Sequence, residues 1–213
     1  MLAVTLVNGI SRTWKENVLK PFEEALAVRL VQFIVDHPGP VCTFNGAAFD
    51  FKVIDNLIPR GTLRDRWVST CLHNHVDIFF DFFTSMGYFA SMNSFCAGSG
   101  TPGKTWSGAE SAKAVKEAMS SGDADQCADV VDRLEAYCVQ DTKCLHGLVL
   151  YLQNNACLHR TSGNGKLTAW VPWELSSFRT VSNCLRAWQL APVTCSWMQT
   201  PPPSPPTLLA WIL

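Results

Sequence analysis

VCTFNGAAFD, residues Val41–Asp50, has the pattern of a buried strand, a tight turn at an Asn-Gly pair and the start of a helix that carries an acid. A second stretch, YCVQD at Tyr137–Asp141, lies in the longest segment with helical periodicity. Residues four apart are neighbours on a helix, so Tyr137 and Asp141 should share a face. We interpret the rest of the chain as support for these two stretches.

The residues before VCTFNGAAFD predict a strand and a helix. Residues 2–8 are typical of a short buried strand that ends at Asn8-Gly9, a dipeptide that favours hairpin turns. Apolar residues at helical spacing predict a helix over residues 23–36, which the sequence His-Pro-Gly-Pro then ends. The order strand, helix, strand predicts an α/β fold in which helices cover a sheet.

The residues after the turn predict a helix that presents an acid. Apolar residues recur there at intervals of three and four, and Pro59 ends the pattern. Asp50 lies off this apolar stripe and should face away from the buried side. The stripe that we expect to be buried is Phe49, Val53, Ile54, Leu57 and Ile58.

Two motifs carry a family resemblance. Asn45, Gly46, Phe49 and Asp50 fit Asn-Gly-x-x-Phe-Asp, and the YCVQD stretch fits Tyr-x-x-x-Asp. Together they resemble the second and third motifs of the DEDD superfamily of 3'-5' exonucleases, in the tyrosine (DEDDy) subclass. The chain most resembles the proofreading exonuclease domain of family-B DNA polymerases and the stand-alone predicted exonucleases related to it. The resemblance implies a ribonuclease-H-like mixed sheet flanked by helices.

The first motif of that family, Asp-x-Glu on the opening strand, does not occur in this sequence. The first acidic residue is Glu16, and the candidate opening strand Leu2–Val7 carries no charge. Either the chain begins downstream of the family's first strand or another residue replaces the motif. We therefore expect an exonuclease-like domain over residues 1–175 that is incomplete at its N-terminus.

The resemblance also implies a site. Asp50 and Asp141 would be catalytic and would bind Mg²⁺ or Mn²⁺ in a two-metal site, and Tyr137 would orient the attacking water. Carboxylate oxygens suit these ions, and paired ions stabilise the attacking and leaving oxygens of phosphate transfer. Asn45 and Phe49 would contact the substrate, a single-stranded DNA or another nucleic-acid 3' end, with RNA left open. The two carboxylates of the first motif have no counterpart.

The glycine-rich segment GSGTPGKT, Gly98–Thr105, satisfies the bare phosphate-binding pattern GxxxxGK[ST]. Pro102 lies inside it, no convincing strand precedes it, and residues 106–108 are a poor helix opening. We therefore favour a chance match over a nucleotide-binding ATPase. Lys104 would instead contact the phosphate backbone of a substrate.

Other polar residues are secondary candidates. His73, His75 and Asp77 alternate as metal ligands on a strand would, but a structural role fits the family better. Asp77 and Asp81 are four apart and could border the site.

Composition excludes some classes of protein. The net charge is -1, so any contact with nucleic acid must be local. The nine cysteines show no zinc-site spacing, which indicates reduced thiols. Without a signal peptide or a long apolar run, we expect a soluble intracellular protein of unknown compartment and no membrane partner.

The last part of the chain has a different character. Five of the eight tryptophans lie from Trp170 onward, and PPPSPP at 201–206 predicts a stiff polyproline segment. We expect a Trp/Pro-rich tail over residues 176–213 without the periodicity of a domain, as a partner-binding arm, an SH3-type ligand or a divergent terminus. The alternative to the exonuclease is thus a non-catalytic ribonuclease-H-like scaffold that binds nucleic acid or a protein.

Overall fold

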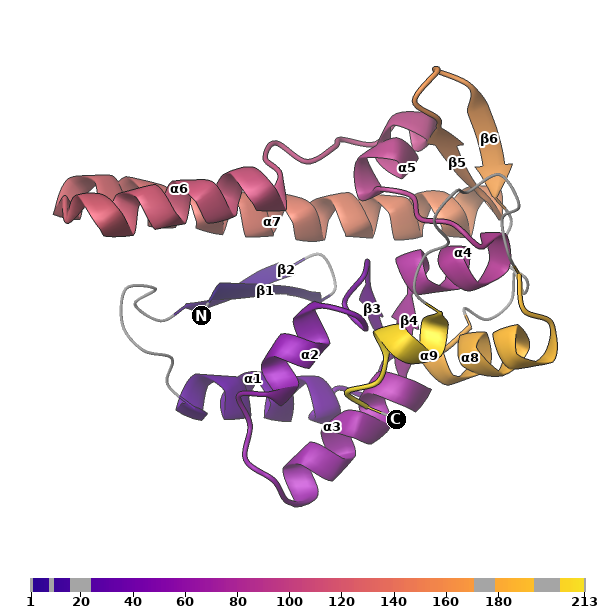
Figure 1. Cartoon of the computed structure of the whole chain (residues 1–213), viewed down its shortest axis with the longest axis horizontal. Helices are drawn as coiled ribbons and strands as arrows, with labels where there is room; N and C mark the ends of the chain where they lie inside the picture. The colour runs from indigo at the N-terminus through magenta and orange to yellow at the C-terminus, as the bar shows by residue number, and fades with distance from the viewer. Residues whose placement is uncertain (1, 8–9, 16–23, 171–178, 194–203, 213) are drawn as a thin grey trace.

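The computed structural model of the chain describes residues 2–7, 10–15, 24–170, 179–193 and 204–212 (Figure 1). Within these residues, helices dominate and the strands pair two by two. The predicted α/β class is confirmed at this level, and the larger ribonuclease-H-like sheet stays a prediction. No helix in the described part of the chain combines the length and the apolar character that crossing a membrane requires.

The N-terminal strands form the expected hairpin. β1 (Leu2–Val7) runs antiparallel to β2 (Ile10–Lys15), with Val7 opposite Ile10, while residues 8 and 9 lie outside the described residues. In β2 the Trp14 ring packs 5.2 Å from that of Phe33. Lys15 Nζ lies 2.7 Å from Glu135 Oε2, which joins the hairpin to the long helix described below.

A parallel strand pair organises the centre of the molecule. β3 (Val41–Thr43) follows α1 (Glu24–Asp36), and it pairs with β4 (His75–Asp77) so that Thr43 lies opposite Asp77. The helices α2 (Asp50–Asp55) and α3 (Thr62–His73) form the connection between the two strands. The carboxyl ends of β3 and β4 therefore meet at one edge, next to the start of α2.

The structure corrects the expected buried face of α2. Ile54 and Ile58 are buried as expected, but Phe49 and Val53 are 62% and 46% exposed, and Phe51 is buried instead. The reason is that α2 packs through Phe51, whose ring lies 4.6 Å from Trp67 of α3 and 4.4 Å from His75 of β4. Asp50 does face away from the core, as expected, and it shares that exposed side with Phe49 and Val53.

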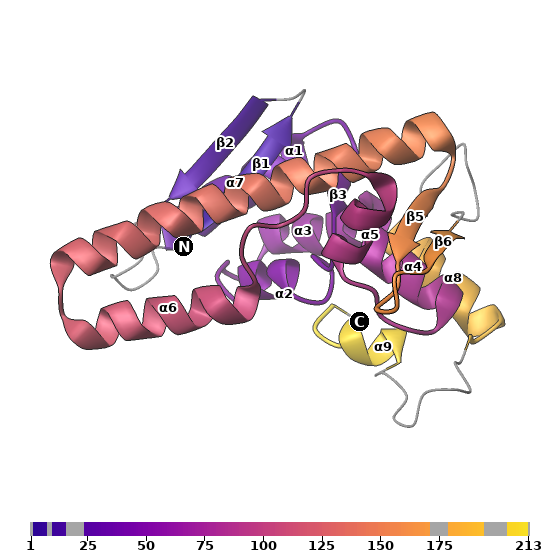
Figure 2. The same ribbon diagram turned by 90° about the horizontal axis from the view of Figure 1, so that it is seen from above.

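The second half of the chain is built on one long helix. α4 (Ile78–Met86) and α5 (Met92–Ser99) precede a helical hairpin of α6 (Gly108–Ser121) and α7 (Ala124–Asn155). α7 lies between α6 on one side and the β1–β2 hairpin on the other (Figures 1 and 2). The strands β5 (Leu158–Thr161) and β6 (Leu167–Trp170) then pair antiparallel and pack on α5.

The glycine-rich segment ends a helix instead of opening one. Gly98 lies in the last turn of α5, where a Cβ would overlap the backbone of His159 and Arg160. Gly100 is the left-handed C-cap of this helix, with φ 65°. A phosphate-binding loop needs a strand before it and a helix N-terminus after it, so the structure contradicts the ATPase alternative.

The expectation that residues 106–108 open a helix poorly is also wrong. The Ser107 hydroxyl accepts a hydrogen bond from the Glu110 backbone N–H, and the Glu110 carboxylate accepts one from the Ser107 N–H at 2.9 Å. This capping box satisfies two donors at the start of α6.

The described parts of the C-terminal segment pack on the core. α8 (Val181–Leu190) contacts α3 and α4, and α9 (Pro205–Leu208) follows in the chain. Leu209 is fully buried in a cluster with Ala47. The segment expected to be a Trp/Pro-rich tail thus contains two helices among its described residues. Pro205 and Pro206 belong to a helix, and the rest of the predicted polyproline segment lies mostly outside the described residues.

Candidate functional site

The Asn-Gly turn after β3 is held by a buried carboxylate. Asp77 Oδ1 accepts a hydrogen bond from the Asn45 backbone N–H at 2.8 Å, and Oδ2 accepts one from the Ala47 N–H at 2.9 Å. Oδ1 also accepts from the Phe80 N–H at the start of α4. Asp77 is 1% exposed, so it holds the turn from the buried side and does not border an open site.

Close approach explains the glycine in this turn. A Cβ at Gly46 would lie 2.5 Å from the Thr43 hydroxyl oxygen, which accepts the Gly46 N–H at 3.2 Å. Thr43 is itself hydrogen-bonded to His75 Nε2 at 2.7 Å. Asn45 adopts the left-handed conformation, with φ 68°, that asparagine tolerates better than most residues. The turn thereby places Asp50 at the start of α2.

The other secondary candidates serve the fold. Asp81 forms a buried ion pair with Arg179, whose Nε lies 2.8 Å from Asp81 Oδ1. His75 is buried against Phe51, and His73 is exposed on α3 beside Ser182. His75 and Asp77 lie in strand β4 and Asp81 lies in α4, where each has a protein partner.

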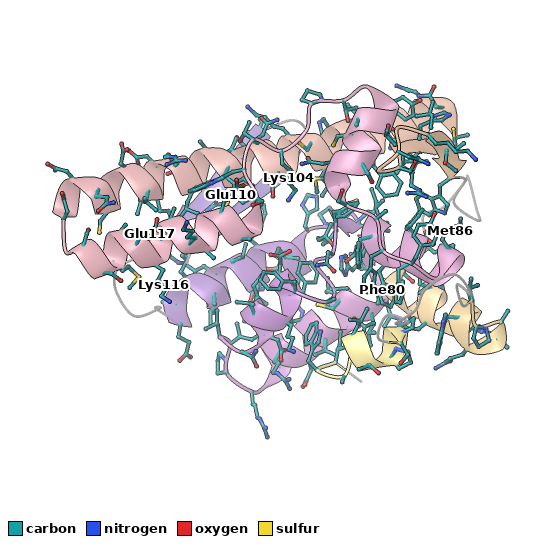
Figure 3. All side chains as sticks on the ribbon, turned by 45° about the horizontal axis from the view of Figure 1, so that its top comes forward. Phe80, Met86, Lys104, Glu110, Lys116 and Glu117 are labelled. Atoms are coloured by element: carbon teal, nitrogen blue, oxygen red, sulfur yellow. The ribbon has the colours of Figure 1, made fainter. Side chains whose placement is uncertain are left out.

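The Lys104 side chain contacts both Tyr137 and Asp141. Its Nζ lies 2.5 Å from Asp141 Oδ2 and 3.4 Å from the Tyr137 hydroxyl oxygen. Both residues of α7 therefore face the same way, as the spacing predicts. Figure 3 labels Lys104 on the segment that joins α5 to α6, where this segment runs along α7.

Two hydrogen bonds fix the peptide unit between Gly103 and Lys104. The Lys104 N–H donates to Asn93 Oδ1 of α5 at 2.8 Å. Gln140 of α7 donates from Nε2 to the Gly103 carbonyl oxygen at 3.3 Å. Lys104 is therefore positioned over the Tyr137–Asp141 face by contacts that do not involve its own side chain.

Asp50 belongs to the same electrostatic cluster. Its side chain reaches solvent but is crowded by protein atoms, and this desolvation is the main cause that raises its pKa to about 6. The Asp77 carboxylate raises the pKa further, Lys104 lowers it, and Asp141 raises it. The structure therefore brings Asp50, Lys104 and Asp141 within reach of one another's charges, although they come from three separate segments.

Two residues that we did not single out from the sequence extend this cluster. The Trp106 ring lies 6.1 Å from the Tyr137 ring, edge to face, and the Arg133 guanidinium lies 4.5 Å from the centroid of Trp106. A signal was present, since Arg133 precedes Tyr137 by four residues on α7 and Trp106 follows Lys104 by two. The Trp106 and Tyr137 rings thus lie in a row between Arg133 and Lys104, and Lys104 pairs with Asp141.

Asp50 and Asp141 are the two carboxylates of this cluster that a divalent ion would contact. Asp141 Oδ1 is buried and has no hydrogen-bond partner among the described residues, which leaves this oxygen available to a cation. Asp50 would add a second carboxylate. However, the described residues contain no group of three or more ligands that could hold a metal ion. A pair of ions needs more carboxylates than these.

Comparisons with known proteins identify no relative of this chain. No family model, no curated protein and no solved structure matches the chain. The fold and the site define a mixed α/β chain in which a lysine pairs with the Asp141 carboxylate beside Tyr137.

Proposed function

We propose that the chain is a 3'-5' exonuclease of the DEDDy type that acts on the 3' ends of single-stranded nucleic acid. The observation that supports this most is the convergence of Asp50, Tyr137 and Asp141, which come from the two motifs, around Lys104. DNA is the first candidate substrate, and RNA is the second. The β3–β4 pair and its helices would be the centre of a ribonuclease-H-like fold.

Each residue has a role in this proposal. A divalent ion held by Asp50 and Asp141 would polarise the terminal phosphate and lower the pKa of a bound water. The Tyr137 hydroxyl would orient that water by a hydrogen bond, and Lys104 would pair with the phosphate as a point charge. Phe49, which is 62% exposed beside Asp50, would pack against the terminal base or sugar. Asn45 would act by shaping the turn.

Trp106 and Arg133 would contact the single strand next to the site. Stacking on aromatic rings and cationic contacts with phosphates are the two terms that bind single strands without sequence preference. A row of this kind supplies the local attraction that a chain of net charge -1 lacks overall.

The proposal is tested on a 5'-labelled single-stranded oligonucleotide in Mn²⁺. We expect a ladder shortened from the 3' end with the wild-type protein and with Asp129→Asn, which changes an exposed acid of the same helix. Asp50→Asn and Asp141→Asn should abolish the ladder. A ladder that survives in both variants would contradict the assignment of these carboxylates.

One observation favours the non-catalytic scaffold as a second candidate. The Lys104 ammonium already neutralises Asp141, as expected of a site that binds nucleic acid without a metal ion. In that case no ladder forms, and the oligonucleotide binds equally well with and without EDTA. Fluorescence anisotropy should then show weaker binding for Trp106→Ala and tighter binding for Asp141→Asn, because loss of that negative charge frees Lys104 for phosphate.

A further inference from the structure

Lys104 forms an ion pair with Asp141 in the candidate site. Its ammonium contacts one oxygen of Asp141 and lies 3.4 Å from the Tyr137 hydroxyl oxygen, and its charge acts on the Asp50 carboxylate. The other oxygen of Asp141 is buried without a hydrogen-bond partner among the described residues. A positive charge at this position offsets the repulsion between the two carboxylates.

Backbone hydrogen bonds hold Lys104 in this position. The bond from its N–H to Asn93 and the bond from Gln140 to the Gly103 carbonyl oxygen both fix the peptide unit that precedes its Cα. Its side chain is only 24% exposed, compared with 23% for Asp141, so the pair is partly shielded from water. An ion pair in such surroundings is stronger than one on an open surface.

We infer that Lys104 is an internal counter-ion that occupies the cation position of the site, so that a divalent ion binds to Asp141 and Asp50 only when the lysine leaves. A substrate phosphate would draw the ammonium away from Asp141 and thereby open the position to the ion. The inference concerns the regulation of the site in the proposed function, and it rests on that function only for the identity of the phosphate.

Mn²⁺ binding without substrate tests the inference, with the signal of free Mn²⁺ followed by electron paramagnetic resonance. We expect Lys104→Met and Lys104→Gln to bind one Mn²⁺ at least about tenfold more tightly than the wild type. Lys104→Arg keeps the charge and should bind Mn²⁺ as weakly as the wild type. Lys143→Met is the matched control, because it removes an exposed lysine two residues from Asp141.

The double variant Lys104→Met with Asp141→Asn should lose the gained binding. Equal Mn²⁺ affinity in the wild type and both neutral variants would overturn the inference, as would tight binding by Lys104→Arg. Circular dichroism establishes that each variant is folded. Oligonucleotide cleavage is measured separately. If the neutral variants gain Mn²⁺ binding but no cleavage occurs, the inference stands and the exonuclease proposal is refuted. If cleavage occurs but the variants gain no Mn²⁺ binding, the exonuclease proposal stands and the inference is refuted.

Discussion

At the scale of single residues, His75 illustrates how burial sets a protonation state. The side chain is buried between Thr43 and Phe51, and burial is the main cause that lowers its pKa below the ordinary 6.5. The unfolded chain takes up a proton as the pH falls through about 6.5, whereas the folded chain resists it. Stability contributed by neutral His75 is therefore present above that pH and lost below it.

We expect the free energy of unfolding of the wild type to fall between pH 7 and pH 5, with a flatter dependence in His75→Gln. Urea titrations at several pH values measure both. His73→Gln is the control, because it removes an exposed histidine of the same stretch. Parallel slopes in the wild type and His75→Gln would show that another group causes the dependence.

Gly46 gives a second prediction at this scale. Gly46→Ala would place a Cβ 2.5 Å from the Thr43 oxygen, within the hydrogen-bonded pair that Thr43 makes with His75. We expect the variant to unfold more readily by about 1–3 kcal/mol, the usual cost of overpacking. Gly108→Ala should have little effect in the same urea titration, because a Cβ added there would meet no atom within 4 Å.

The residue pattern predicted part of the site and not the rest. The i,i+4 spacing of Tyr137 and Asp141 and the Asn-Gly turn before Asp50 are local signals, and the structure confirms both geometries. The ion pair of Lys104 with Asp141 depends on how the α5–α6 segment packs on α7, which no local pattern encodes. The row of Trp106 and Arg133 depends on the same packing.

At the scale of elements, β3 and β4 act as one unit through Asp77. The carboxylate accepts backbone N–H groups from the turn after β3 and from the start of α4. In Asp77→Asn the amide NH₂ would face one of these donors, and the charge would be lost. We expect a loss of about 2–4 kcal/mol in the free energy of unfolding.

Asp129→Asn is the matched control for this measurement, because Asp129 is exposed on α7. A chemical-shift map should also differ between the two variants, with changes at Asn45 and Ala47 in Asp77→Asn alone. If Asp77→Asn were as stable as the control, the carboxylate would not be what fixes the turn.

Helix boundaries and helix faces were predictable to different degrees. The Ser-x-x-Glu pattern at Ser107 encodes the start of α6 and could have been recognised from the sequence. The face of α2 was not predictable from spacing, since Phe49 and Phe51 both continue an apolar pattern. Which face of α2 is buried depends on the Trp67 ring of α3, against which Phe51 packs.

At the scale of the whole molecule, the C-terminal segment reaches back to the site. Trp211 Nε1 donates to the Ala47 carbonyl oxygen at 2.9 Å, in the turn that leads to Asp50. Leu209, Phe80 and Ala47 belong to one buried cluster with residues of α8. The expected division into a domain and a tail rested on composition, and composition carries no information about this packing.

We therefore expect Leu209→Ala to weaken the whole fold and not only its end. Leu209 is fully buried, and the cavity that a Leu→Ala change leaves in a core costs about 2–5 kcal/mol in the free energy of unfolding. Leu190→Ala is the control and should cost little, because the Leu190 side chain is 79% exposed. Hydrogen exchange should show faster exchange at β3 and the Asn45 turn as well as at α8. If exchange rose at the C-terminal residues alone, the segment would be a separable tail, and the site would not depend on it.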